Sequence, residues 1–248
     1  MKNHIDSYRR RFLSALGGIV AVGAVPALVL KAGYASGEVP IKPADQPVTN
    51  ARRWGMLIDI NKLTDGGVAM VEACKREHGW DNNPLSSTEQ KAHWARVVKV
   101  TDKTTRHSFR LPVMCQHCAK PPCVDVCPTG ASMQRADGIV LVNKHICIGC
   151  RYCMMACPYK ARSFVHEPLQ DQKADSPRGI GTVESCNLCV HRLDRGQLPA
   201  CVEAAPQAVI FGDLQDPNSS ISQTLQRLGG KQIRADLNLD TGVRYLGL

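Results

Sequence analysis

The chain has 248 residues, enough for one large domain or two small ones, and a formal net charge of +9. Five basic residues against Asp6 give residues 1–35 a charge of +4, which leaves +5 for the rest, without a basic patch. This distribution argues against a nucleic-acid-binding surface, so we expect no nucleic-acid partner.

The N-terminal segment has the pattern of an export signal. Arg9 and Arg10 are followed, after one residue, by an apolar run from Phe12 to Leu30, as in twin-arginine signals. Small residues up to Ala35 suit cleavage at that point, so residues 1–35 form the predicted signal peptide. The alternative is a retained N-terminal anchor helix, since the run is near the ~20 residues of a membrane span. We expect a periplasmic protein, exported folded and membrane-associated through partners or such an anchor.

The rest of the chain alternates short strand-like runs with turns. A Pro-rich linker is expected at 36–50, a domain at 51–215, and a C-terminal helix and tail at 216–248. Strands are predicted at 54–60, 96–101, 108–114, 138–143, 162–166 and 208–214. Short helices that start at or near Pro are predicted between them, and a helix with an Asn or Ser cap and a Gly stop at 218–230.

A dense cysteine motif follows the middle of the chain. Four cysteines before a proline have the C-x2-C-x2-C-x3-C spacing of bacterial ferredoxins: Cys147, Cys150, Cys153 and Cys157. In that run three thiolates hold one [4Fe–4S] cluster and the fourth reaches a second cluster. Gly149 allows the close turn that lets the three sulfurs converge. Zinc is disfavoured, because zinc sites pair two cysteines with a second pair well downstream.

A second run supplies the partner cluster. Its cysteines are Cys115, Cys118, Cys123 and Cys127, the last again before a proline. Exchange of the fourth ligands between the two runs predicts two clusters. Cluster 1 then has the ligands Cys115, Cys118, Cys123 and Cys157. Cluster 2 has the ligands Cys147, Cys150, Cys153 and Cys127.

A third run is incomplete, because Ala205 stands where its fourth cysteine belongs. Read back from Cys74, the ferredoxin spacing falls on Thr64, Gly67 and Met70, none of which is a ligand. The same exchange assigns Cys74 to the third run. Cluster 3 then has the ligands Cys186, Cys189, Cys201 and Cys74. A fourth cluster would have had its ligands at Thr64, Gly67, Met70 and Ala205, and none of these four positions is a cysteine.

The twelve cysteines thus divide into three complete sets, which predicts three [4Fe–4S] clusters and leaves no thiol for disulfides. A [3Fe–4S] cluster in one position is the alternative. The fold class expected is α+β, with tandem, interleaved bacterial-ferredoxin-like modules and long connections over 51–215. His117 and His145 lie near ligands and could donate an N–H to a cluster, although a loop role is the simpler interpretation.

The three cysteine phrases resemble a known family. CQHCAKPPCVDVCPTGA, CIGCRYCMMACPYKAR and HRLDRGQLPACVEAAP are similar to signatures of iron–sulfur electron-transfer subunits of the dimethyl-sulfoxide-reductase and polysulfide-reductase type, over about 54–214. Such subunits normally bind four clusters, so the missing one departs from the pattern. With its export signal, the chain most resembles the periplasmic iron–sulfur subunit of the membrane Dsr complex of dissimilatory sulfur metabolism.

This resemblance implies a hetero-oligomer. The implied partners are a polytopic quinone-interacting membrane subunit and a multihaem cytochrome c or other redox subunit. The chain would pass single electrons through three clusters in a membrane-bound complex of sulfur metabolism. One alternative is the iron–sulfur subunit of a molybdopterin reductase acting on tetrathionate, polysulfide or a sulfoxide. Another is an iron–sulfur or zinc protein of assembly or sensing. We expect no catalytic residue, since no catalytic triad, carboxylate pair or phosphate loop is found in the sequence.

Overall fold

The computed structural model describes residues 37–80, 91–170 and 172–248. All described residues belong to one compact unit, which begins at Gly33. The predicted signal peptide therefore lies outside the described residues. Within the described ranges, no helix has both the length and the apolar character that a membrane crossing needs.

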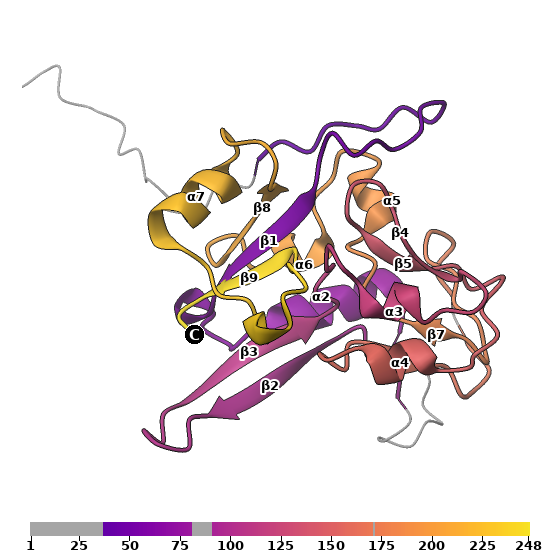
Figure 1. Cartoon of the computed structure of the whole chain (residues 1–248), viewed down its shortest axis with the longest axis horizontal. Helices are drawn as coiled ribbons and strands as arrows, with labels where there is room; N and C mark the ends of the chain where they lie inside the picture. Colours follow the sequence, from indigo (N-terminus) through magenta and orange to yellow (C-terminus); the bar gives the residue numbers. More distant parts are fainter. Residues whose placement is uncertain (1–36, 81–90, 171) are drawn as a thin grey trace, which may run out of the picture. The chain divides into compact units, whose positions relative to one another are not determined.

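The described residues form short strands and short helices (Figure 1). The strands are β1 (Trp54–Asp59), β2 (Ala95–Thr101), β3 (Ser108–Met114), β4 (Ser132–Gln134), β5 (Val140–Val142), β6 (Ser163–Phe164), β7 (Val183–Glu184), β8 (Val209–Asp213) and β9 (Val243–Leu246). The helices are η1 (Ile60–Lys62), α2 (Val68–His78), α3 (Pro122–Asp125), α4 (Tyr152–Ala156), α5 (Val190–Leu193), α6 (Ala200–Glu203), α7 (Ser220–Leu228) and η2 (Ala235–Leu237). This mixture is compatible with the α+β class.

The main sheet joins segments from both ends of the described chain. Its order is β8-β1-β9, with β1 antiparallel to β8 and parallel to β9. Every residue of β1 is buried, and its first residue, Trp54, stacks on Phe211 of β8 with the ring centroids 5.3 Å apart. Helix α7 packs on β8, between a Ser219 cap and Gly229. The predicted strands at 54–60 and 208–214 and the helix at 218–230 are confirmed, whereas β9 was not predicted.

The second sheet is a hairpin that leads into the first cysteine run. Strands β2 and β3 pair antiparallel from Ala95 with Met114 to Thr101 with Ser108, as the two predicted strands require. The end of the hairpin near Met114 is buried and the other end is exposed. Because Cys115 directly follows β3, the buried end of the hairpin positions the first cysteine.

The helix starts differ in part from the prediction. Helix α3 begins at Pro122 and α6 follows Pro199, as expected. Helices α2, α4 and α5 instead follow residues in the left-handed conformation: Gly67 (φ 93°), Arg151 (φ 65°) and Cys189 (φ 50°). The proline prediction is wrong for these three helices, because a left-handed residue provides the sharp turn instead.

Both segments flanking the predicted domain contact it. Residues 37–50 were expected as part of a linker, yet Val39 is buried in the main core. The Gly37 N–H donates to the carbonyl of Phe211, and the Lys42 N–H donates to that of Asp194. At the other end, residues 216–248 contribute α7 and β9, so the expected C-terminal tail supplies an edge strand of the main sheet.

Candidate metal centres

One cavity is lined by the four cysteines predicted for cluster 1. Cys115 and Cys118 follow β3, Cys123 lies in α3, and Cys157 follows α4. The remote residue Cys157 therefore lies with the first cysteine run. Burial raises the pKa of Cys115 and of Cys118 to about 12. These thiols keep their protons unless a metal displaces them.

A second cavity is lined by the four cysteines predicted for cluster 2. Its remote residue is Cys127, whose sulfur accepts a hydrogen bond from the Ser132 N–H over 3.2 Å. Burial alone would raise the pKa of Cys127, but such hydrogen bonds outweigh it and lower the pKa. The Val183 N–H donates to the sulfur of Cys147 over 3.5 Å. Because Cys150 is exposed, this site opens to solvent.

The turn in the second cavity depends on Gly149. Its φ is 70°, and a Cβ there would lie 2.1 Å from the carbonyl oxygen of Gly181. It would also lie 2.9 Å from the ring of Phe164. The approach of the 179–182 turn leaves no space for a side chain, as expected from the sequence for this position.

The third set brings Cys74 to the last cysteine run. Helix α2 carries Cys74 and packs against α6, which carries Cys201. Burial and then neighbouring thiols raise the pKa of Cys74, Cys186 and Cys201 well above the ordinary value. Cys186 and Cys189 act on Cys74, and Cys189 and Cys74 act on Cys201, all within this set. Cys201 and Cys189 of the set act on Cys186, together with Cys115 of the first set. The structure thus gathers the four cysteines predicted for cluster 3.

Two side chains at the end of α2 direct nitrogen atoms at sulfurs of this set. The indole Nε1 of Trp80 donates to the sulfur of Cys74 over 3.2 Å. His78 has its Nε2 3.3 Å from the sulfur of Cys189 and its Nδ1 3.0 Å from the hydroxyl of Ser176. Burial lowers the pKa of His78 to about 3, so the ring is neutral. Neither residue was predicted from the sequence, and the one signal for them is that both lie a few residues after Cys74 in the chain.

The positions of the missing fourth set form no ligand group of their own. Met70 is 1% exposed, and Met70 and Ala205 both belong to the main hydrophobic core. Gly67 begins α2 with a φ of 93°, and a Cβ there would lie 2.8 Å from Pro112. Thr64 is exposed. Apolar packing therefore fills the region in which two of these four residues lie.

The donor set fits iron–sulfur clusters. All twelve cysteines are free thiols, and several sulfurs accept backbone or side-chain N–H groups. Thiolate-only ligand sets are typical of iron–sulfur clusters and of some zinc sites. The part of the chain that the structure describes has no group of three or more His, Cys, Asp or Glu side chains placed to hold a single metal ion.

The two histidines near the cysteine runs have different environments. His145 is exposed. His117 is only 2% exposed, and its Nδ1 accepts a hydrogen bond from the Val140 N–H over 3.0 Å. Its proton is therefore on Nε2, which has no hydrogen-bond partner among the described residues. Burial, followed by the charge of Arg162, lowers the pKa of His117 to about 3, so this ring is a neutral N–H donor inside the fold.

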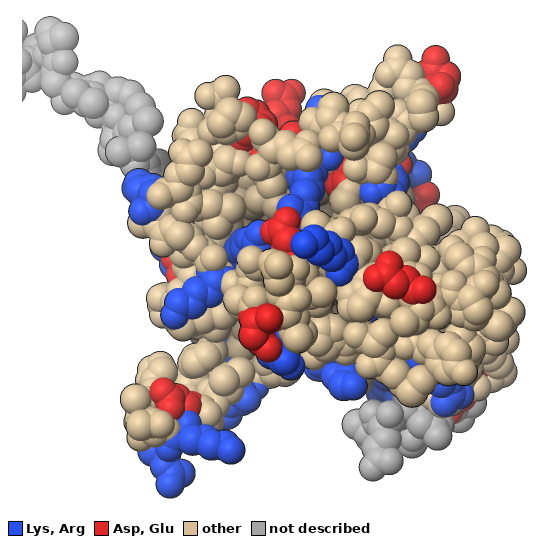
Figure 2. All heavy atoms as spheres, in the orientation of Figure 1, with Lys and Arg blue, Asp and Glu red and all other residues tan. Residues whose placement is uncertain are grey.

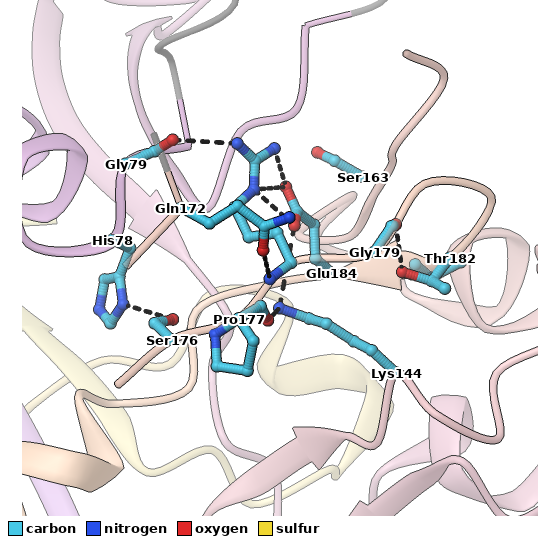
Figure 3. Close-up of polar contacts among 12 residues, drawn as sticks. His78, Gly79, Lys144, Ser163, Gln172, Ser176, Pro177, Gly179, Thr182 and Glu184 are labelled. Carbon is cyan, nitrogen blue, oxygen red and sulfur yellow. Dashed lines mark hydrogen bonds and ion pairs between the residues drawn. The ribbon is translucent and has the colours of Figure 1, made fainter. Parts of the chain in front are cut away.

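A buried ion-pair network supports the third set (Figure 3). Glu184 is 0% exposed, and Arg178 donates to both of its carboxylate oxygens at 2.7 to 3.2 Å. Arg178 also donates to the carbonyl of Gly79 over 3.0 Å, and the Lys144 ammonium lies 3.9 Å from Glu184. The network joins the end of α2 to β7, which ends two residues before Cys186.

Comparisons with known proteins point to one family. The model of a 4Fe-4S dicluster domain matches residues 106–214. The Hdr-like menaquinol oxidoreductase iron-sulfur subunit 1 of Archaeoglobus fulgidus is 38% identical, over 97% of this chain and 98% of the relative. One subunit of the tetrathionate reductase of Salmonella typhimurium is 35% identical, over 99% of this chain and 90% of the relative. One subunit of the sulfite dehydrogenase of Allochromatium vinosum is 35% identical, over 77% of this chain and 81% of the relative.

Proposed function

Because the chain belongs to the family of iron–sulfur electron-transfer subunits of dimethyl-sulfoxide-reductase-type and related membrane-bound complexes, we propose that it carries single electrons through three [4Fe–4S] clusters. The ligands are the three sets of four cysteines defined above. The observation that carries this proposal is the crossed lining of the two cavities, in which Cys157 lies with the first run and Cys127 with the second. Such crossing is the arrangement of two-cluster ferredoxins.

Contacts between the sets support the cluster order 3–1–2. The pKa of Cys186 in the third set is raised by burial, by Cys201 and then by Cys115 of the first set. The pKa of Cys123 in the first set is raised by burial, by Cys157 and then by Cys153 of the second set. Cluster 1 is therefore the middle one, and electrons pass through it between the other two.

The surface near cluster 2 is suited to a redox partner. Its ligand Cys150 is exposed, and so are the apolar side chains of Ile148, Tyr152 and Met155 around it. The surface over α3 and α4 is mainly uncharged (Figure 2). An apolar surface around an exposed ligand lets a partner bring its own cofactor close, and we assign electron exchange with a redox subunit to this face.

We place this chain in the periplasm, exported by the twin-arginine route, in a complex with a polytopic quinone-interacting membrane subunit and a multihaem cytochrome c or other redox subunit. Similarity over nearly the whole chain to a subunit named for menaquinol oxidation supports the quinone link. The second candidate is a subunit of a molybdopterin reductase, which the tetrathionate reductase relative favours. Since these relatives are oxidoreductase subunits, they lend no support to an assembly or sensor role.

Iron and acid-labile sulfide per chain test the cluster count. We expect about twelve irons in anaerobically purified wild type, from three clusters of four. Cys74→Ser should lose about four irons or show a three-iron EPR signal. Ala73→Ser is the matched control, because it adds a hydroxyl at the neighbouring buried position of α2 and keeps all thiols. About eight irons in wild type, unchanged by Cys74→Ser, would contradict cluster 3.

Purification of the native complex separates the two candidate functions. A tagged chain isolated from membranes should bring a polytopic membrane subunit and a haem protein, identified by mass spectrometry and haem staining. A stoichiometric molybdopterin subunit in their place would favour the second candidate. Molybdenum analysis of the same sample tests independently for a molybdopterin subunit.

A further inference from the structure

Arg162 is a buried cation for which the described residues provide no carboxylate partner. The residue follows α4 in the chain and directly precedes β6, and it is 5% exposed. Both terminal nitrogens, Nη1 and Nη2, are buried and have no hydrogen-bond partner among the described residues. A buried charge without a partner is strongly unfavourable, so this position indicates an anionic group that the side chains do not provide.

Thiols surround the guanidinium on two sides. Arg162 lines the cluster 1 cavity, and its charge lowers the pKa of Cys115 and Cys123, although burial keeps both raised. It acts in the same way on Cys153, a member of the second set. Burial lowers the pKa of Arg162 itself, and the charges of these three thiols raise it above its ordinary value.

The position is therefore between two ligand sets. Cys115, Cys123 and Cys153 belong to one buried group, with Cys123 in α3 and Cys153 in α4. Lys160, two residues before Arg162, is exposed, so the chain sends one cation inward and one outward. Arginine suits the inner position, because its guanidinium does not lose its proton in proteins and offers five N–H donors in a plane.

We propose that Arg162 is an electrostatic bridge between clusters 1 and 2, which stabilises the reduced form of both. This inference rests on the proposed function, because it needs both clusters. One-electron reduction adds a negative charge to a cluster, with the electron supplied by a redox partner and no bond formed or broken. A cation between the two clusters favours that charge on either one and reduces the repulsion between them.

Redox titration followed by EPR on the full chain, purified with its clusters, tests the bridge. Arg162→Met removes the charge and keeps a long apolar side chain. At a fixed potential we expect the ratio of reduced to oxidised cluster to fall at least tenfold for clusters 1 and 2, which is about 59 mV for one electron. Arg162→Lys should restore most of this ratio. The matched control Lys160→Gln removes an exposed charge nearby and should leave both potentials unchanged.

The inference is overturned if Arg162→Met leaves both potentials in place or moves only one of them. Wild-type protein with ¹⁵N-labelled guanidinium groups provides a test without a variant. Its ENDOR spectra should contain a nitrogen coupling to each of the two reduced clusters, and absence of the coupling from either overturns the bridge. Iron content distinguishes a failure of the proposed function from a failure of this inference. Fewer than two clusters in wild type would contradict both. Full iron content with unchanged reduction potentials in Arg162→Met would contradict the bridge alone.

Discussion

The indole N–H of Trp80 donates a hydrogen bond to the sulfur of Cys74 across 3.2 Å, and both side chains are buried. A hydrogen bond to a ligand sulfur favours the reduced, more negative cluster and so raises its reduction potential. Trp80→Phe keeps an aromatic ring and removes this donor. We expect the midpoint potential of cluster 3 to fall by about 40 mV, which corresponds to about 1 kcal/mol for one electron. EPR-monitored redox titration measures this change.

Trp54→Phe is the matched control for that experiment. The indole of Trp54 is also buried, but it donates to the carboxylate of Asp137 over 3.1 Å. Its loss should lower the stability of the protein and leave the three potentials unchanged. Equal cluster 3 potentials in wild type and Trp80→Phe would show that this hydrogen bond does not set the potential.

Gly149→Ala should prevent assembly of cluster 2. The new Cβ would lie 2.1 Å from the carbonyl oxygen of Gly181, and the φ of 70° disfavours any side chain. We expect about four irons fewer per chain, measured with acid-labile sulfide. Gly130→Ala is the control, because its φ is 67° but no atom lies within 4 Å of the added Cβ. Full iron in Gly149→Ala would mean that the 179–182 turn moves to make space.

Arg178→Met should destabilise the fold strongly. Among the described residues, it leaves the fully buried Glu184 with one cation, Lys144, at 3.9 Å. Removing one partner of a buried ion pair costs about 3–5 kcal/mol of the free energy of unfolding. The double variant with Glu184→Leu should recover most of it, as measured by anaerobic denaturant unfolding. Arg195→Met removes the exposed ion pair with Asp175 and should change stability little. A similar loss in both single variants would contradict the burial argument.

Export should depend on the arginine pair at the N-terminus. Replacing Arg9 and Arg10 with lysine should keep the protein in the cytoplasm, since the twin-arginine route reads that pair. Arg11→Lys, which leaves the pair intact, should still be exported. Cell fractionation and immunoblotting measure the distribution. Periplasmic protein from the double-lysine variant would indicate another export route.

Much of the fold was predictable wherever its signal is local. The runs that became β1, β2 and β3 are short and rich in apolar residues, and the run that became α7 has a cap and a glycine stop. Strand β9 was missed because it has four residues and pairs in parallel with a strand far earlier in the chain. The start of helix α2 was predicted wrongly, because the helix follows Gly67 and does not begin near a proline.

In the candidate site too, the features with a local signal were predictable and those that depend on tertiary packing were not. Cysteine spacing was enough to propose every ligand set, including the isolated Cys74, because iron–sulfur runs have a strict local period. The residues that act on the sulfurs were not predicted. His78 meets Cys189 only through the packing of α2 against the last cysteine run, and Arg162 meets Cys123 and Cys153 only where α3 and α4 converge. Such contacts depend on tertiary packing and have no signature in the spacing.

The separation of Cys74 from its partners has a consequence for biosynthesis. In the proposed ligand sets, Cys74 precedes every ligand of clusters 1 and 2, and its three partners follow them all. A growing chain can complete clusters 1 and 2 once Cys157 has been made, but cluster 3 must wait for Cys201. Cluster 3 then acts as a clasp that closes one long loop around the other two, and closing a long loop is where a metal link restricts the unfolded chain most. A chain that has assembled cluster 3 therefore contains all the ligands of clusters 1 and 2 within the closed loop.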